Sequence, residues 1–226
     1  MSNLSGPDRD ALLRLGSFRR YAPSEALMVE GGLDSTVALL LDGCVKVTVG
    51  AEEGSTVLLA IRAPGDVVGE LAALDGRPRS ATVVAARGTS ARVIGGAAFR
   101  AFLRERPDAA GEMQRSVVAK LRDAIRYRID TVGGPVPVRL ARTLDTLVRA
   151  YGRPTAQGLR IDVPLSNADL AALAGVSPAS VQRALRALRT SGAVTTEYRS
   201  VVVRDVTLLR AAAAGQARPD TAELAS

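Results

Sequence analysis

Two short runs of residues in the first half of the chain have the chemistry of an anion-binding pocket. Gly69-Glu70-Leu71-Ala72 predicts a short helical turn whose free backbone N–H groups accept an anion. Arg79 adds a permanent charge with a forked donor geometry that suits phosphate, and Ser80 adds a hydroxyl. Glu70 is an acceptor for a sugar hydroxyl. One such residue alone would indicate only a surface turn with a Glu–Arg pair, but the ordered set suits a cyclic phosphate with its ribose.

The composition excludes most catalytic chemistry. The chain has no histidine and one cysteine, Cys44, so it lacks the base of a Ser/His/Asp triad and the ligands of zinc or iron–sulfur sites. The sequence therefore predicts that the protein is not an enzyme and holds no metal or resident cofactor. Cys44 is predicted to be a small core residue, and the absence of an internal disulfide fits a reducing cytoplasm. No signal peptide is evident, and Asp42 and Lys46 interrupt the most apolar stretch, so no membrane span is expected.

The second chemical feature lies between residues 165 and 194. Ser166 is a good N-cap for a first short helix, Gly175 permits a sharp turn, and Ser177 caps a second helix with Pro178 at its first position. This spacing predicts a helix-turn-helix, with a recognition helix from about Ser177 to Arg189. The alternative is an ordinary helical hairpin.

Arginine and glutamine can bond base edges bidentately in the major groove. Polar and cationic side chains face outward from the predicted motif, and the candidate DNA contacts are Ser166, Ser177, Ser180, Gln182, Arg183 and Arg186. Arg183, Gln182 and Ser180 are the candidate base readers, whereas Arg186 and Arg189 suit phosphates. Two strands at about 193–196 and 200–203 predict a wing. Charge fits this interpretation, because residues 135–226 carry net +5 of the chain's +7, although an arginine-rich solvated surface would look the same.

Several elements must position these residues. A short helix is predicted at about 7–16, and alternating apolar residues between 17 and 95 predict a β-barrel or jelly-roll-like body, with Asp42-Gly43 as a hairpin turn. A long helix is predicted at 107–132, then a Gly133-Gly134-Pro135 hinge, a helix at about 138–151 and a loop at 152–158. An apolar stripe follows one face of the long helix and comprises Val118, Leu121, Ile125, Ile129 and Val132. It predicts a two-helix dimer interface, or else a helix packed on its own barrel.

Together these features resemble the cyclic-AMP receptor protein/FNR family of bacterial transcriptional regulators, from about Leu12 to Val206. The resemblance implies an α+β fold with a jelly-roll-like β-roll binding a cyclic nucleotide over 1–106 and a dimerisation helix with hinge over 107–134. It also implies a winged helix-turn-helix over 135–210, and a flexible tail is expected over 211–226. By the same likeness, Glu70 holds the ribose 2′-hydroxyl, and Arg79 and Ser80 hold the phosphate with backbone near Gly69, Leu71 and Ala81. The implied protein is a cytoplasmic homodimer that binds palindromic DNA and RNA polymerase and is controlled by cyclic AMP or a similar ligand.

Two departures from the family pattern keep alternatives open. Ala124 and Ile125 stand where the cyclic-AMP receptor has hydroxyl residues that contact adenine, so a vestigial pocket or a different ligand is an alternative. The recognition helix begins Ser177-Pro178-Ala179-Ser180-Val181 and lacks the family's first base-reading arginine and glutamate, which predicts a different half-site. Missing cysteines exclude the family's iron–sulfur sensors, and missing histidines argue against its haem sensors. A third hypothesis is a cyclic-nucleotide sensor that acts through protein contact.

Overall fold

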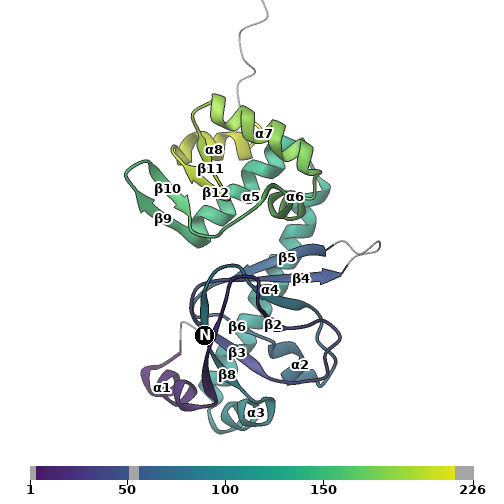
Figure 1. Cartoon of the computed structure of the whole chain (residues 1–226), viewed down its shortest axis with the longest axis vertical. Helices are drawn as coiled ribbons and strands as arrows, with labels where there is room; N and C mark the ends of the chain where they lie inside the picture. The colour runs from purple at the N-terminus through teal and green to yellow at the C-terminus, as the bar shows by residue number, and fades with distance from the viewer. Residues whose placement is uncertain (1–3, 51–55, 217–226) are drawn as a thin grey trace, which may run out of the picture. The chain divides into compact units, whose positions relative to one another are not determined.

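The computed structural model describes residues 4–50 and 56–216, with only the backbone for 126–132. The chain forms two compact units, Met1–Ala124 and Ile125–Ser226, and each is described by itself (Figure 1). None of the helices in the described residues is long and apolar enough to cross a membrane. Of the tail predicted at 211–226, residues 217–226 lie outside the described part.

The first unit is built from two four-stranded sheets, in the orders β1-β8-β3-β6 and β2-β7-β4-β5. Its strands are β1 (Ser17–Tyr21), β2 (Ala26–Met28), β3 (Val37–Asp42), β4 (Val45–Gly50), β5 (Thr56–Arg62), β6 (Val67–Val68), β7 (Thr82–Ala85) and β8 (Thr89–Ile94). Its helices are α1 (Gly6–Arg14), α2 (Glu70–Asp75), α3 (Gly96–Glu105) and most of α4 (Pro107–Val132). The predicted jelly-roll-like body is therefore confirmed as a pair of antiparallel sheets.

The turn at Asp42-Gly43 differs from the predicted hairpin. β3 pairs with β6 and β8, whereas β4 pairs with β5 and β7, so the turn carries the chain from one sheet to the other. Gly43 has a φ of 85°, and a Cβ there would come within 2.4 Å of the carbonyl oxygen of Gly88. Asp42-Gly43 therefore predicted the turn correctly. The expected pairing of the two flanking strands was wrong, because strand partners are set by packing across both sheets.

Two apolar clusters hold this unit together. The cluster between the two sheets includes Tyr21, Leu40, Val45 and Val83. The second cluster lies where α1, α3 and α4 contribute side chains against the first sheet, and its buried members are Leu12, Val37, Leu39, Val67, Ala73, Ile94, Phe99, Phe102, Ala109 and Met113. Because α4 takes part in this second cluster through Ala109 and Met113, the beginning of the long helix is anchored on the β-roll.

The second unit consists of the end of α4, further helices and a small sheet of order β11-β12-β10-β9. Its helices are α5 (Val136–Tyr151), α6 (Asn167–Ala174), α7 (Pro178–Thr190) and α8 (Val206–Ala213). Its strands are β9 (Gly152–Thr155), β10 (Gly158–Ile161), β11 (Val194–Glu197) and β12 (Ser200–Val203). The segment predicted as a loop at 152–158 instead holds β9 and the turn to β10, because it pairs with the strand that adjoins the wing.

Buried side chains from three helices form the core of this unit. α5 buries Leu140, Leu144 and Leu147, and α7 contributes Val181, Leu185 and Leu188. α8 packs against α5, where the Asp145 carboxylate pairs with Arg149 and with Arg210 of α8 at 3.2 Å. The predicted recognition helix α7 therefore packs on α5, which also packs on α8.

Candidate ligand and nucleic-acid sites

Gly69 joins the two predicted runs of the ligand site. It stands immediately before α2 with a φ of 81°, in the left-handed region that favours glycine. A Cβ at this position would come within 2.6 Å of Arg79 Nη1 and of the Met28 side chain. The backbone of the first run thus approaches the guanidinium of the second run more closely than any other residue type would permit.

Arg79 lies inside the β-roll, with its side chain only 2% exposed. Nη1 donates to the carbonyl oxygen of Gly69 at 2.9 Å, and Nη2 donates to the backbone carbonyl and hydroxyl of Thr36 at 2.6 and 3.0 Å. The Asp34 carboxylate accepts from the other side of the fork, through Nε at 3.4 Å and through a short contact with Nη2. A buried guanidinium needs such partners, because an unpaired buried charge is very costly.

Asp34 and Arg79 form an asymmetric ion pair. The Asp34 side chain is 55% exposed, so the carboxylate lies between the enclosed guanidinium and solvent. Hydrogen bonds from Arg79, and then from the Thr36 hydroxyl and backbone, hold the pKa of Asp34 at about 2 against partial desolvation. Asp34 is therefore ionised at neutral pH and neutralises the predicted phosphate-binding arginine.

Glu70 also has an internal partner. The carboxylate, 7% exposed, accepts from Lys120 Nζ of α4 at 2.9 Å, and the same ammonium donates to the carbonyl oxygen of Val67 at 2.7 Å. The sequence places Lys120 off the apolar stripe of α4, and the structure turns it toward the β-roll. A residue predicted to bind a sugar hydroxyl is thus linked directly to the long helix.

The other predicted ligand residues surround this cluster. Leu71 points outward with 45% exposure and Ala72 is buried, while Ser80 is exposed and Ala81 is half-buried. Sequence reasoning missed Asp34, Thr36 and Lys120. Each lies more than 40 positions from its partner, and no local pattern marks it. Within the described residues, no group of three or more His, Cys, Asp or Glu side chains offers a metal site.

The helix-turn-helix has the caps that its sequence predicts. The Ser166 hydroxyl accepts from the Asp169 N–H at 3.1 Å, and the Asp169 carboxylate accepts from the Ser166 N–H at 2.7 Å, which completes a capping box. Gly175 ends α6 in the left-handed region with a φ of 61°. The Ser177 hydroxyl then caps α7 by accepting from the Ser180 N–H at 3.2 Å. Ser166 and Ser177 therefore have a structural role whether or not they contact DNA.

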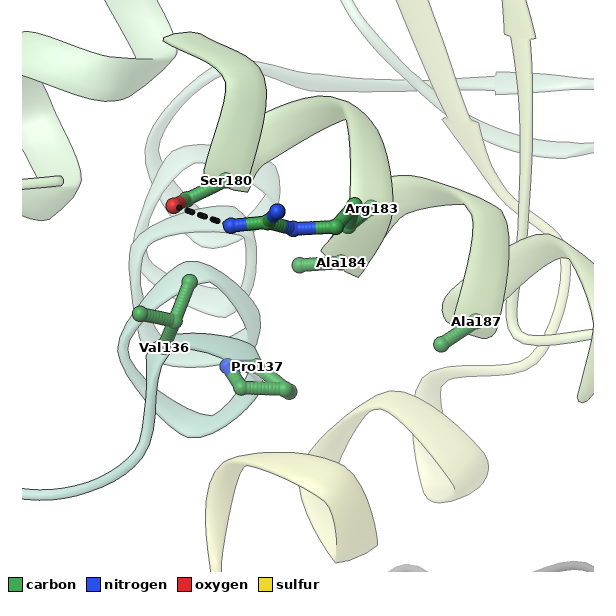
Figure 2. A pocket seen from close by; sticks show the side chains of 6 residues that line it. All are labelled: Val136, Pro137, Ser180, Arg183, Ala184 and Ala187. Carbon is green, nitrogen blue, oxygen red and sulfur yellow. Dashed lines mark hydrogen bonds between the residues drawn. The ribbon is translucent and has the colours of Figure 1, made fainter. Parts of the chain in front are cut away.

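The predicted readers lie on the outer face of α7. Gln182 and Arg183 are exposed, as is the predicted phosphate contact Arg186, and Ser180 is half-buried. Val181 and Leu185 are buried on the opposite face. The Arg183 guanidinium donates to the Ser180 hydroxyl at 3.2 Å. It lies beside a small cavity of about 180 Å³ that Val136 and Pro137 of α5 also line (Figure 2). Arg183 is thus only lightly held in this structure.

The wing adds two exposed side chains at its tip. Tyr198 is 91% exposed, and Arg199 turns the hairpin with a φ of 52°. In the first strand of the wing, the Thr196 hydroxyl of β11 accepts from Arg189 Nη1 at 2.9 Å. This bond ties Arg189, predicted as a phosphate contact, to the wing.

Each of the two regions that carry these residues matches a known domain family. Residues 18–106 match the cyclic nucleotide-binding domain family, and residues 138–212 match the Crp-like helix-turn-helix domain family. The chain belongs to the CRP/FNR family of transcriptional regulators. The predicted family and fold class are therefore confirmed, with DNA binding and transcription regulation as the function that the family assigns.

The alignments with individual relatives cover most of this protein. It is 30% identical over 208 residues to the cyclic AMP receptor protein of Thermus thermophilus, which covers 91% of this chain and 93% of that protein. It is 27% identical over 185 residues to a CRP-like cAMP-activated global transcriptional regulator of Mycobacterium tuberculosis, covering 82% and 83% of the two chains. A crystal structure of another CRP-family regulator from Thermus thermophilus superposes with a TM-score of 0.74 at 25% identity, covering 87% of this chain and 96% of the other.

Proposed function

We propose that this CRP/FNR-family protein is a homodimeric regulator whose DNA binding is controlled by a cyclic nucleotide in the β-roll. The observation that carries the proposal is the enclosed guanidinium of Arg79, 2.9 Å from the Gly69 carbonyl at the start of the Glu70 turn. An arginine with restricted exposure and a forked donor set suits a cyclic phosphate, and the adjacent Glu70 carboxylate suits a ribose hydroxyl. Relatives named as cAMP-activated or as a cyclic AMP receptor favour this ligand class.

Ligand control has a physical route through the long helix. Glu70 is bonded to Lys120 of α4, so a ribose hydroxyl that binds Glu70 competes with or reorients this contact. A ligand shifts a conformational equilibrium only by its differential affinity for the two states. We therefore expect the nucleotide to favour the arrangement of α4 and the Gly133-Gly134 hinge in which the recognition helices fit DNA.

Calorimetry at high protein concentration tests ligand binding directly. We expect heat and saturable binding with cyclic AMP or cyclic GMP, lost in Arg79→Gln but retained in Arg77→Gln, which removes an exposed arginine two residues away. Arg79→Gln must keep the wild-type circular dichroism spectrum for the comparison to count. An absence of binding by both nucleotides would contradict the proposed ligand.

The homodimer is proposed from the exposed apolar side chains of α4. Val118, Leu121 and Ile125 are 47, 59 and 53% exposed, which argues against a helix fully packed on its own barrel. A second copy of α4 would cover this stripe. The predicted continuation through Ile129 and Val132 falls among residues whose side chains lie outside the described part.

Sedimentation equilibrium tests the dimer. We expect wild-type dimers and about a hundredfold weaker association for Leu121→Glu, because two carboxylates would be buried within the stripe. Arg122→Glu, at the next position of the helix, is the matched control and should remain dimeric. Wild-type association by Leu121→Glu would place the dimer interface elsewhere.

DNA recognition is proposed through Arg183, Gln182, Ser180 and Arg186, with Ser166 and Ser177 at the helix starts. The exposed face of α7 supports direct readout of major-groove edges. The family likeness extends the proposal to palindromic sites, contact with RNA polymerase and a place in the cytoplasm. Selection of bound DNA from a random pool, with and without cyclic AMP, tests it. A half-site repeated with two-fold symmetry is expected, and enrichment of unrelated sequences would contradict it.

A second candidate keeps DNA binding and changes its control. Ala124 and Ile125 lack the hydroxyls of the cyclic-AMP receptor, and Arg79 already has an internal counter-ion in Asp34. A constitutive regulator, or one with a different ligand, is consistent with both observations. Equal affinity for the selected DNA with and without cyclic nucleotide would favour this candidate over the first.

A further inference from the structure

The Asp34 carboxylate occupies the side of Arg79 that a ligand phosphate would need. Nε and Nη2 both face Asp34, and this pair of donors is the fork that binds carboxylate and phosphate bidentately. Nη1 is directed to the Gly69 carbonyl and Nη2 also to Thr36. The chain therefore supplies its own anion to the guanidinium.

The loop that carries Asp34 is fixed beside Arg79 by its backbone. The Gly31 N–H donates to the Arg79 carbonyl at 2.8 Å, and the Arg79 N–H donates to the Gly32 carbonyl at 2.8 Å. A Cβ at Gly32 would come within 3.4 Å of Arg79 Cγ, so the two segments are in close contact. These bonds hold Asp34 at a high effective concentration near the guanidinium.

Besides Arg79, the carboxylate is held by Thr36, whose hydroxyl and N–H donate to Asp34 Oδ1 at 2.7 and 3.2 Å, and it can leave by exchanging these exposed bonds for water. Its side chain is 55% exposed, whereas that of Arg79 is 2% exposed, so Asp34 can turn into water without opening the core. Its release breaks neither backbone bond between the loop and Arg79. Arg79 would keep Gly69 and Thr36 as acceptors, while Nε and the Nη2 hydrogen that faces Asp34 become available to a ligand anion.

We propose that Asp34 is an internal competitor for the ligand phosphate, and that an anionic ligand binds by exchanging with its carboxylate on Arg79. This inference rests on the proposed ligand site and adds an affinity-determining residue to it. Because the pair is half exposed, its contribution is modest. Removal of the carboxylate should tighten binding about fivefold to tenfold. A supporting role for Asp34, in which it orients Arg79 for the ligand, predicts the opposite sign.

The experiment compares wild type, Asp34→Asn and Asp34→Ala in two assays. The first is calorimetric binding of cyclic AMP and cyclic GMP. The second is the thermal shift produced by inorganic phosphate against chloride at matched ionic strength, which probes access to Arg79 without a nucleotide. Asp42→Asn changes the same charge at the exposed end of β3 and is the matched control. Asp34→Asn/Arg79→Gln tests whether any gain requires the guanidinium.

The expected result is tighter nucleotide binding and a new phosphate-dependent stabilisation in both Asp34 variants, absent in Asp42→Asn and in the double variant. A phosphate response without any nucleotide binding would support the exchange and overturn the proposed nucleotide ligand. Nucleotide binding that is unchanged or weaker in the Asp34 variants would overturn the exchange and leave the ligand site standing. No response to nucleotide or phosphate in any variant would overturn both proposals.

Discussion

Arg79 in the β-roll and Arg183 on the recognition helix are both predicted to bind an anionic or polar ligand, but their surroundings differ. Arg79 is enclosed and has acceptors from Asp34, Thr36 and Gly69. Arg183 is exposed and donates to the Ser180 hydroxyl within its own helix. A DNA base can reach Arg183 by displacing its hydrogen bond to the Ser180 hydroxyl. An anionic ligand at Arg79 must replace the ion pair with Asp34.

The same contrast separates the two carboxylates of the ligand site from the polar residues of α7. Asp34 and Glu70 are each neutralised by a cation distant in sequence, Arg79 and Lys120. The hydroxyls of Ser177 and Ser180 bond within three residues of their own positions. The candidate ligand site is thus assembled by tertiary contacts, while the candidate DNA-binding surface is assembled by one helix and its cap.

The largest expected effect concerns the pair between Glu70 and Lys120. We expect Lys120→Gln to lower the free energy of unfolding by about 3 kcal/mol, because it leaves a buried carboxylate without its charged partner. Urea unfolding followed by circular dichroism measures the change. Arg122→Gln, an exposed position on the same helix, should cost less than about 0.5 kcal/mol.

The double variant Glu70→Gln/Lys120→Gln sharpens this test, since it removes both charges. It should recover part of the loss. A Lys120→Gln protein as stable as Arg122→Gln would show that the first unit does not depend on this ion pair, and would remove the proposed link from Glu70 to α4.

The next effect concerns Arg183. We expect Arg183→Ala to weaken binding to the selected half-site by about 1–3 kcal/mol, while binding to unrelated DNA changes little, because a bidentate contact to a base edge discriminates between bases. Fluorescence anisotropy at several salt concentrations measures both affinities. Arg104→Ala removes an exposed arginine from the first unit and is the control. An equal loss on both DNAs would make Arg183 a phosphate contact.

A smaller effect is expected at Ser166. Loss of a hydroxyl N-cap costs about 1 kcal/mol, so Ser166→Ala should raise the hydrogen-exchange rate of the α6 amides by about fivefold. Thr190→Ala, at the exposed end of α7, should leave these amides unchanged. Protection that stays at the wild-type level would mean that the Asp169 half of the capping box is sufficient.

These differences also explain what the sequence could predict. α4 spans Pro107–Val132 as its periodicity indicates, and the caps at Ser166 and Ser177 lie where the residue types place them, because caps and amphipathic helices are local. The turn at Gly43 could also be predicted from the sequence. The change of sheet at this turn could not, since strand pairing depends on residues far along the chain.

The ligand site divides in the same way. Gly69, Glu70 and Arg79 are recognisable as a set from their order, and the structure brings them together. Their partners Asp34 and Lys120 belong to a loop and a helix whose sequences carry no sign of the contact. A sequence therefore indicates which groups can bind a ligand more readily than it indicates which groups already bind each other.

The smallest expected effect tests whether the closed arrangement at Arg79 persists in solution. The pKa of Asp34 is about 2, below its ordinary value of 3.8, so its pairing stabilises the fold fully above about pH 5 and is lost as the pH falls toward 2. The difference in unfolding free energy between wild type and Asp34→Asn should therefore be constant above about pH 5 and shrink between about pH 4 and 2. Urea unfolding at a series of pH values measures it, and Asp8, whose pKa is also lowered by Arg106, cancels because both proteins retain it. A difference that does not change with pH would mean that Asp34 is not paired with Arg79. Arg79 would then keep Gly69 and Thr36 as acceptors without an internal anion, and its contrast with Arg183 would no longer include an ion pair.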